Sequence, residues 1–391
     1  MQERSETTAK WEPFGHPNPM DMYKELRAKC PVAHADLPFD WVQGAWGVFR
    51  YGDIMEVVKD TKTFSNAVPR FPSFPRAPLE LDPPLHGAYR RAMQPFFSPK
   101  KMAELEPMVT DIASRLLEPL VKEGSGDFAK QFSYQMPVRV ILSFVHQPEE
   151  DWEHLSRWAE HIFLRRYDQA RYEKAYADLT AYSRSIVESR KSRPLDPEKD
   201  IVSAMLAHEV NGEKVNDEMV VGILNLMLTA GHDSTTSSMG IVVNYLAHHP
   251  EDQERLRKER DLIPMAIEEI LRYESPVQLM PRKVTRNVEL QGQQLKEGDV
   301  IFIALGSGNR DESAFPDADR CIIDRNPTKS LVFGHGIHKC IGAPLARLEL
   351  KVAVEQLFDR TDWFEPLGQA ERTEFQRFGV STLPLKLVPK R

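Results

Sequence analysis

The sequence predicts a mainly α-helical protein that also contains small β-sheets, an α+β fold. Apolar residues recur at three- and four-residue spacing from His86 to about Glu274, which is the period of amphipathic helices. After Pro276 the period changes to two, which is typical of strands. Because no Pro/Gly/Ser-rich linker divides the 391 residues, we expect a single domain over residues 1–391.

The composition is that of a globular protein and argues against several classes. Hydrophobic residues make up 41% of the chain and charged residues 28%. A formal net charge of −7 disfavours nucleic acid as a partner. No apolar run approaches the ~18 residues of a membrane span, the N-terminus lacks a signal-peptide pattern, and three cysteines do not make a disulfide framework. We therefore predict a cytoplasmic protein with no membrane or nucleic-acid partner.

Strands and an irregular loop are expected before the helical region. Residues 41–53, WVQGAWGVFRYGD, predict short strands around a glycine turn. Residues 64–86 contain six prolines and no helical period, so they predict a long irregular loop. Loops of that length inside compact proteins are often functional.

A long central helix is expected between Asn216, a plausible N-cap, and Pro250. Its length of about 48 Å and its apolar sequence MVVGILNLMLTAG require it to run through the interior. In its middle, residues 230–236 form helix poorly, and their Ser and Thr side chains can return hydrogen bonds to the backbone. A buried acid in such a patch costs free energy and indicates a function.

The last third of the chain predicts a strand, a glycine turn and a second strand over residues 282–305. A final helix is expected to open at Gly342, with Pro344 in its first turn, and to run to Phe358.

Residues 333–342, FGHGIHKCIG, place Cys340 directly before that helix, where backbone N–H groups and the helix dipole stabilise a thiolate. Such a thiolate suits a nucleophile, with His338 as its base, or a metal ligand. Zinc needs more ligands and an iron–sulfur cluster usually needs four thiolates, whereas heme needs a single axial thiolate. The plain alternative is a free cysteine buried in a turn.

The same stretch resembles the cysteine loop of the cytochrome P450 family, F-G-x-G-x-H-x-C-x-G. Its six fixed positions are occupied by Phe333, Gly334, Gly336, His338, Cys340 and Gly342. The resemblance extends from about His86 to Leu350 and is strongest to soluble bacterial members. It implies a P450-like fold that binds heme b (iron protoporphyrin IX), with Cys340 as axial ligand of the iron. It also implies heme contacts from Phe333, Gly334, Gly342 and Ala230.

His86 and Arg90 lie four residues apart on one predicted helix, so both side chains point the same way. Two such groups suit the two propionates of heme. The resemblance assigns them this role, together with Arg282 and His338. The alternative is that His86 and Arg90 cap a helix and cover the surface.

Two more motifs match the family. Glu269-x-x-Arg272 matches E-x-x-R, which implies a buried ion pair behind the cysteine loop with Arg320 as its third member. Asp233 lies in the family's A-G-x-[D/E]-T-T motif, whose acid and alcohol relay protons to oxygen. Ser234 stands where Thr is usual, so oxygen use is expected to be coupled less tightly to product, or Thr235 takes part.

The resemblance implies a monooxygenase that inserts one atom of O2 into a small-to-medium apolar or aromatic substrate. Electrons are expected from a ferredoxin-type donor with an NAD(P)H-dependent reductase. The predicted substrate pocket is hydrophobic, and we expect Arg70 and Arg76 to face solvent rather than bind a substrate carboxylate. The residues predicted to line the pocket are Phe71, Phe74, Leu226, Val277 and Phe378.

Basic residues on segments flanking the thiolate side of the heme predict a docking surface for an acidic redox partner. The alternative is a solvated face with local ion pairs. The residues concerned are Arg90, Arg91, Lys100, Lys101, His335, Lys339 and Arg347.

Three other functions remain open. A heme–thiolate sensor needs no proton relay, so the pair Asp233–Ser234 disfavours it. The same pair argues mildly against a peroxide-driven peroxygenase. A cysteine hydrolase using Cys340 and His338 predicts a colourless protein.

Overall fold

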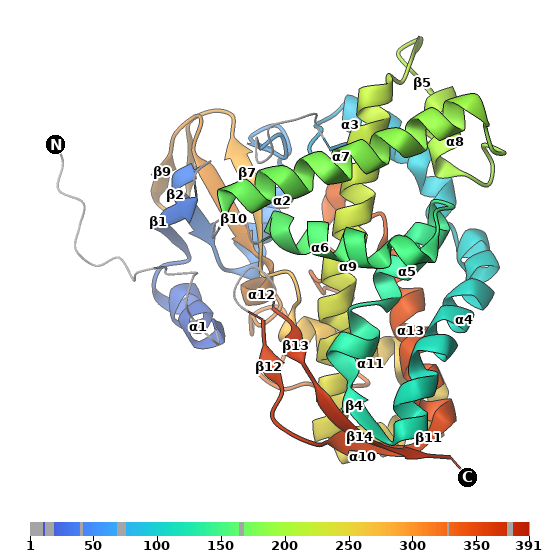
Figure 1. Cartoon of the computed structure of the whole chain (residues 1–391). Helices are drawn as coiled ribbons and strands as arrows, with labels where there is room; N and C mark the ends of the chain where they lie inside the picture. The colour runs from blue at the N-terminus through green and yellow to red at the C-terminus, as the bar shows by residue number, and fades with distance from the viewer. Residues whose placement is uncertain are drawn as a thin grey trace.

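The computed structural model describes residues 11, 19–39, 42–68, 76–163, 168–326, 328–373 and 378–390. Helices fill one side of the molecule, and a five-stranded sheet lies beside them (Figure 1). This confirms the predicted mainly α-helical fold with small sheets. The helices are α1 (Met20–Lys29), α2 (Tyr51–Lys59), α3 (Leu85–Met93), α4 (Pro99–Glu123), α5 (Met136–Phe144), α6 (Trp152–Phe163), α7 (Gln169–Ser192), α8 (Ile201–Ala207), α9 (Asp217–His248), α10 (Pro250–Lys258), α11 (Ile263–Glu274), α12 (Leu305–Gly308) and α13 (Ala343–Arg360).

The largest sheet has the strand order β1-β2-β10-β7-β3 and is mixed. Strand β10 runs parallel to β2 and antiparallel to β7, while the other neighbouring pairs are antiparallel. Its strands are β1 (Val32–Phe39), β2 (Val42–Val48), β3 (Phe64–Ser65), β7 (Leu279–Val284) and β10 (Val300–Ala304). The smaller sheets contain β4 (Ser125–Asp127), β5 (Glu209–Val210), β6 (Glu213–Lys214), β8 (Val288–Leu290), β9 (Gln293–Leu295), β11 (Thr361–Pro366), β12 (Glu371–Arg372), β13 (Val380–Thr382) and β14 (Pro384–Pro389).

Helix α9 forms the centre of the helical region, as the sequence predicts. The side chain of Asn216 accepts a hydrogen bond from the N–H of Met219 at 2.8 Å and so caps the helix. The helix ends at His248, immediately before His249 and Pro250. Helices α5, α6, α7, α11 and α13 contact it (Figure 1), and most of its side chains are buried.

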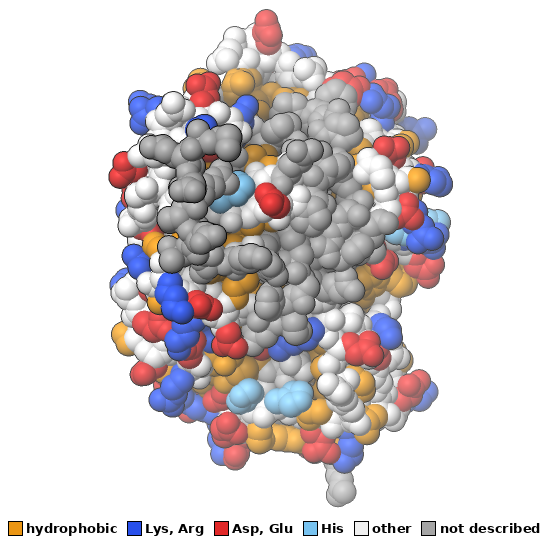
Figure 2. Space-filling model, turned by 90° about the vertical axis from the view of Figure 1, so that its left-hand side faces the viewer, with side chains coloured by type: hydrophobic (Ala, Val, Ile, Leu, Met, Phe, Trp, Pro, Cys, Tyr) orange, Lys and Arg blue, Asp and Glu red, His pale blue; other side chains and the backbone are white. Residues whose placement is uncertain are grey.

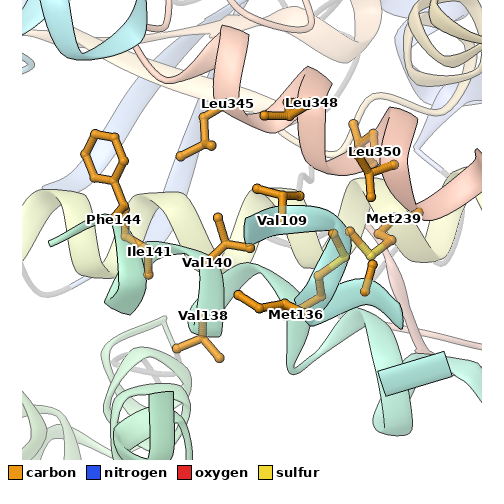
Figure 3. Packing of buried hydrophobic residues seen from close by; sticks show 14 of the residues in the cluster. Val109, Met136, Val138, Val140, Ile141, Phe144, Met239, Leu345, Leu348 and Leu350 are labelled. Atoms are coloured by element: carbon orange, nitrogen blue, oxygen red, sulfur yellow. The ribbon is translucent and has the colours of Figure 1, made fainter. Parts of the chain in front are cut away.

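The main core lies where α4, α5, α9 and α13 meet. Figure 3 shows Val109 of α4, Met136 and Val140 of α5, Met239 of α9 and Leu348 of α13 packed together. Since these helices come from distant parts of the chain, this packing holds the N-terminal end of α13, and therefore the cysteine before it, against α9.

The predicted glycine turn within residues 41–53 is wrong. Gly44 and Gly47 lie inside the single strand β2. A Cβ on Gly44 would lie 2.9 Å from the His34 ring, and one on Gly47 would lie 2.5 Å from the Phe49 ring. The glycines therefore make room for aromatic side chains instead of reversing the chain.

The glycine turn predicted between strands near the end of the sheet region is confirmed. Gln291 and Gly292 connect β8 to β9 with φ values of 50° and 78°, the left-handed conformation that a tight hairpin needs. Along the chain, β7 precedes this hairpin and β10 follows it. Strand β7 contains Arg282, which therefore lies in the largest sheet.

Candidate functional site

The cysteine loop, residues 333–342, is held in a compact turn. The N–H of Cys340 donates to the carbonyl of Phe333 at 2.8 Å, which closes the loop at its base. Gly334 and Gly336 have φ values of 68° and 71°, which side-chain-bearing residues rarely adopt. A Cβ on Gly336 would also lie 3.1 Å from the carbonyl oxygen of Val58. Glycine at position 336 is therefore required both by the backbone and by its neighbour.

The thiol of Cys340 is exposed, but the atoms of the protein around it are dense enough to desolvate it. This desolvation raises the pKa of the thiol. The N–H groups of Gly342 and Ala343, followed by the charges of Arg90 and Arg347, act in the opposite direction. The first turn of α13 thus points two N–H groups at the sulfur, and these favour the thiolate against the larger effect of desolvation.

Four basic side chains lie close enough to influence one another, and we call them the cationic cluster: His86 and Arg90 from α3, Arg282 from β7 and His338 from the cysteine loop. Arg90 also acts on the thiol of Cys340. The rings of His86 and His338 lie 4.3 Å apart between centroids. Burial, followed by the charges of His86, Arg282 and Arg90, lowers the pKa of His338 to about 3. Burial also lowers the pKa of Arg282 to about 10.

The cationic cluster contains buried nitrogen atoms that lack hydrogen-bond partners. The Nε2 atoms of His86 and His338 are buried and have no hydrogen-bond partner within the described part of the chain. Arg282 is 6% exposed, and its guanidinium donates to the carbonyl of the adjacent Pro281 at 2.8 Å. Buried polar atoms are normally paired, so this arrangement indicates an anionic ligand. The residues present therefore fit the two carboxylates of heme.

The predicted ion pair behind the cysteine loop is present and fully buried. Arg272 donates to both carboxylate oxygens of Glu269, at 2.7 and 2.9 Å, and both side chains are 0% exposed. The third member is Arg325, whose Nε lies 3.0 Å from Glu269. The assignment of Arg320 is wrong, because its side chain is exposed and only its backbone carbonyl accepts a bond from Arg272.

Asn309 connects this ion pair to the cysteine loop. Its carbonyl accepts from Arg272 at 2.7 Å, and its side-chain oxygen accepts from the N–H of Leu331 at 2.7 Å. The carbonyl of Leu331 in turn accepts from the N–H of Gly334. The buried charge and the loop therefore belong to one hydrogen-bonded unit.

The central patch of α9 remains helical. Ser234 donates to the carbonyl of Ala230 at 3.1 Å, and Ser238 donates to the carbonyl of Ser234 at 2.7 Å. This confirms that hydroxyl side chains return bonds to the backbone there. Ala230 is accessible although residues 220–229 are all buried, so α9 also presents an open surface at this point. Asp233 and Ser234 are half-buried, and Thr235 is buried.

The described residues of the predicted substrate pocket come from three separate parts of the chain. Leu226 is a largely buried residue of α9, while Val277 and Phe378 are half-buried. The N–H of Phe378 donates to the carbonyl of Pro276, which brings the C-terminal turn beside the segment that contains Val277. Phe71, Phe74 and Arg70 lie outside the described residues.

Arg76 does not face solvent as the sequence analysis predicts. It is 8% exposed and donates to the carboxylate of Glu80 through Nε at 3.1 Å. A charge already matched by a neighbouring carboxylate is also poorly suited to binding a substrate carboxylate.

The predicted docking residues differ in their environment. Arg91, Lys100, His335 and Lys339 are exposed. Lys101 lies 3.6 Å from Glu104. Arg347 binds Glu268 through both ends of its guanidinium and covers the ring of Phe333, 4.4 Å from its centroid. The last contact places a cation directly beside the start of the cysteine loop.

Sequence reasoning missed two residues of the site, Arg325 and Asn309. Residues 315–326, FPDADRCIIDRN, contain two arginines, and nothing in the local pattern tells which one turns inward. Asn309 belongs to no recognised motif. Only the hydrogen bonds of the folded chain reveal its position between α11 and the cysteine loop.

Comparison with known proteins gives a consistent result. The family model of Cytochrome P450 matches residues 128–390. The Vitamin D(3) 25-hydroxylase of Pseudonocardia autotrophica is 32% identical over 388 residues, which cover 95% of this chain and 94% of that protein.

Solved structures agree with the sequence comparison. Cytochrome P450 CYP109Q5 from Chondromyces apiculatus has a TM-score of 0.87 and 33% identity, covering 98% of this chain and 99% of the other. CYP109E1 from Bacillus megaterium, solved in complex with testosterone, has a TM-score of 0.83 and 33% identity, covering 94% and 99%. Within the described ranges, no helix combines the length and apolar character needed to cross a membrane.

Proposed function

Since this chain belongs to the cytochrome P450 family, whose members bind heme b and act as monooxygenases, we propose that Cys340 supplies the axial thiolate of its heme. We further propose that His86, Arg90, Arg282 and His338 bind the heme propionates. The observation that carries this assignment is the accessible, desolvated thiol beside a basic cluster with two unpartnered histidine nitrogens. We also propose that residues 1–391 form a single heme domain.

Heme ligated by a thiolate activates O2 for insertion of one oxygen atom into an organic substrate. The remaining roles belong to side chains of the chain itself. The two N–H groups at the start of α13 favour a negative sulfur. The two arginines of the cationic cluster offset the charge of the propionates, and its two histidines offer them hydrogen bonds. We propose that Asp233 and Ser234, which are half-buried beside the accessible Ala230 of α9, carry protons to the oxygen, together with Thr235 one position further along.

The proposed substrate is a small-to-medium apolar or aromatic molecule. Leu226, Val277 and Phe378 offer it hydrophobic contacts, and the charge of buried Arg76 is already matched by Glu80. CYP109E1 was solved with testosterone, and the relative from Pseudonocardia autotrophica is named for vitamin D(3). We therefore propose polycyclic lipophilic alcohols and ketones as the first compounds to test.

The proposed electron source is a ferredoxin-type protein with an NAD(P)H-dependent reductase, in a cytoplasmic setting. The exposed side chains of Arg91, Lys100, His335 and Lys339 support an acidic partner, because all four belong to segments that flank the cysteine side of the site. Figure 2 shows the side of the molecule that carries α1, β1 and β2, where acidic and basic side chains are intermixed, as on an ordinary solvated surface.

The deciding experiment is the absorption spectrum of the reduced protein under carbon monoxide, recorded for the wild type, C340S and C321S. Thiolate-ligated heme gives a red-shifted Soret band, which we expect in the wild type and in C321S but not in C340S. Cys321 is half-buried and lies outside the loop, so it is a matched control. A colourless wild type contradicts the assignment and favours the cysteine hydrolase. A red-shifted band that persists in C340S contradicts the assignment too, because the thiolate must then come from another cysteine.

A further inference from the structure

The cationic cluster draws on elements that are far apart in the sequence. His86 and Arg90 lie on α3, whereas Arg282 lies on β7. Strand β7 pairs with β3, in the register Phe64 with Val284 and Ser65 with Lys283. The spacing between α3 and Arg282 therefore depends on what fastens α3 to β3.

Asp82 makes that connection. Its carboxylate accepts a hydrogen bond from the hydroxyl of Ser65 and another, at 3.0 Å, from the N–H of Asn66. Its backbone carbonyl accepts the N–H of His86 at 3.0 Å. One residue thus holds the first turn of α3 and the end of β3 together.

A second contact strengthens the same junction. The side-chain amide of Asn66 donates to the carbonyl of Leu79 at 3.0 Å. The hydroxyl of Ser65 also accepts the N–H of Ala67 at 2.9 Å. Ser65 is therefore held in place to donate to Asp82, and removing its hydroxyl weakens the junction without altering its charge.

Asp82 also acts on the cationic cluster through its charge. The pKa of Arg282 is lowered chiefly by burial, and the negative charge of Asp82 opposes that change. The pKa of His86 is lowered first by burial and then by Arg90, and Asp82 again opposes the decrease. A carboxylate that influences both elements of the cluster must lie close to where the propionates are proposed to bind.

We propose that Asp82 is a positioning residue for the heme: it fixes the distance between α3 and β7, and its charge offsets part of the positive charge that faces the propionates. This inference rests on the proposed function, because it presupposes heme at the cationic cluster. It predicts two separable effects, one of geometry and one of charge.

The test compares D82N, S65A and the wild type as heme-loaded proteins. Asparagine keeps one acceptor oxygen and replaces the other with an NH2 donor, so D82N removes the charge and one of the two hydrogen bonds that the carboxylate accepts. S65A keeps the charge and removes one hydrogen bond. D60N is the control for loss of a surface carboxylate, because Asp60 interacts with Thr63 and Arg286 outside the cluster. The measurements are the heme midpoint potential and the rate of heme transfer to apomyoglobin.

For D82N we expect a more positive midpoint potential, because removing a nearby negative charge favours the added electron, together with faster heme transfer, because one of the two junction bonds is lost as well. For S65A we expect a several-fold faster transfer with little change in potential. D60N should match the wild type in both. An unchanged potential in D82N, or an unchanged transfer rate in S65A, overturns the inference.

The carbon monoxide spectrum separates this inference from the proposed function. If the wild type lacks the thiolate band, the proposed function itself fails. If the wild type and all three variants keep the band while D82N and S65A behave like D60N, only the role of Asp82 is wrong.

Discussion

His86 of α3 and His338 of the cysteine loop lie ring to ring, with centroids 4.3 Å apart and planes inclined by 54°. Burial lowers the pKa of both imidazoles, for His338 to about 3, so both rings are neutral at pH 7. A neutral imidazole carries one N–H, and neither buried Nε2 has a partner among the residues described. The pair therefore presents two unpartnered ring nitrogens at one place, and each can donate a hydrogen bond to an anionic ligand when its N–H lies on Nε2.

The first prediction concerns heme retention by H86A. A hydrogen bond to a charged group contributes about 1.5–3 kcal/mol, so losing the one proposed for His86 should speed heme loss on the order of tenfold or more. Transfer of heme to apomyoglobin measures the rate. H248A is the control, since His248 is exposed at the end of α9. Equal rates in both variants would exclude His86 as a residue that binds a heme propionate.

A second prediction tests which arginine completes the buried ion pair. R272A should destabilise the fold by about 3–5 kcal/mol, because it leaves the fully buried Glu269 without its main partner. R325A should cost about 1–3 kcal/mol. R320A should change stability by no more than about 0.5 kcal/mol, because that side chain is exposed. Urea unfolding gives the three values, and a cost for R320A similar to that for R325A would contradict the structure.

The third prediction concerns Glu349, a fully buried carboxyl on α13 with an unpartnered Oε2. Burial raises its pKa well above the ordinary value. Above the pKa of the unfolded chain, about 4.3, folding must then take up a proton, so stability falls as pH rises. E349Q removes this dependence and should be more stable than the wild type at pH 8 but not at pH 4.

Thermal unfolding of E349Q and the wild type between pH 4 and pH 8 measures the effect. E254Q provides the comparison, because Glu254 is an exposed residue of α10 paired with Lys258. We expect E254Q to leave the pH profile nearly unchanged. A constant difference between E349Q and the wild type at all pH values would show that Glu349 does not titrate as its burial implies.

A fourth prediction addresses proton delivery by Asp233. D233N should slow product formation by about 10²-fold if the carboxyl transfers protons, and should leave the carbon monoxide spectrum unchanged. D217N, at the first turn of the same helix and paired with Lys191, is the control. Product and O2 consumption are measured together. Product formation by D233N at the wild-type rate removes the proposed role.

The positions of helices could be predicted from the sequence where strong local patterns mark their ends. Asn216 and Pro250 define α9 to within a residue, because capping and proline effects act locally. The position of Cys340 before α13 was predictable for the same reason. Gly44 and Gly47 were misread, since their role depends on the rings of His34 and Phe49, which only the folded sheet brings near.

In the site as well, contacts between residues that are close in the sequence could be predicted, whereas contacts between distant residues could not. The spacing of Glu269 and Arg272 fixes a pair on one helix, so it could be predicted. The choice between Arg320 and Arg325 depends on how the loop after α12 folds over α11, which no short pattern contains. Asn309 binds Arg272 through its own backbone carbonyl and binds the backbone N–H of Leu331 through its side chain. Hydrogen bonds to backbone groups do not depend on the identity of the partner residue, so no sequence pattern predicts them.

The order of the site residues along the chain has a consequence for biosynthesis. His86 and Arg90 are made early, Arg282 much later, and His338 and Cys340 near the end of the sequence. At about 5–20 residues per second, the ribosome needs roughly 13–50 s to pass from the first histidine to the second. Throughout that interval α3 exists without the loop that completes the cluster. The full set of residues proposed to hold the heme therefore does not exist before Cys340 has been made, and translation products truncated before Cys340 should be colourless.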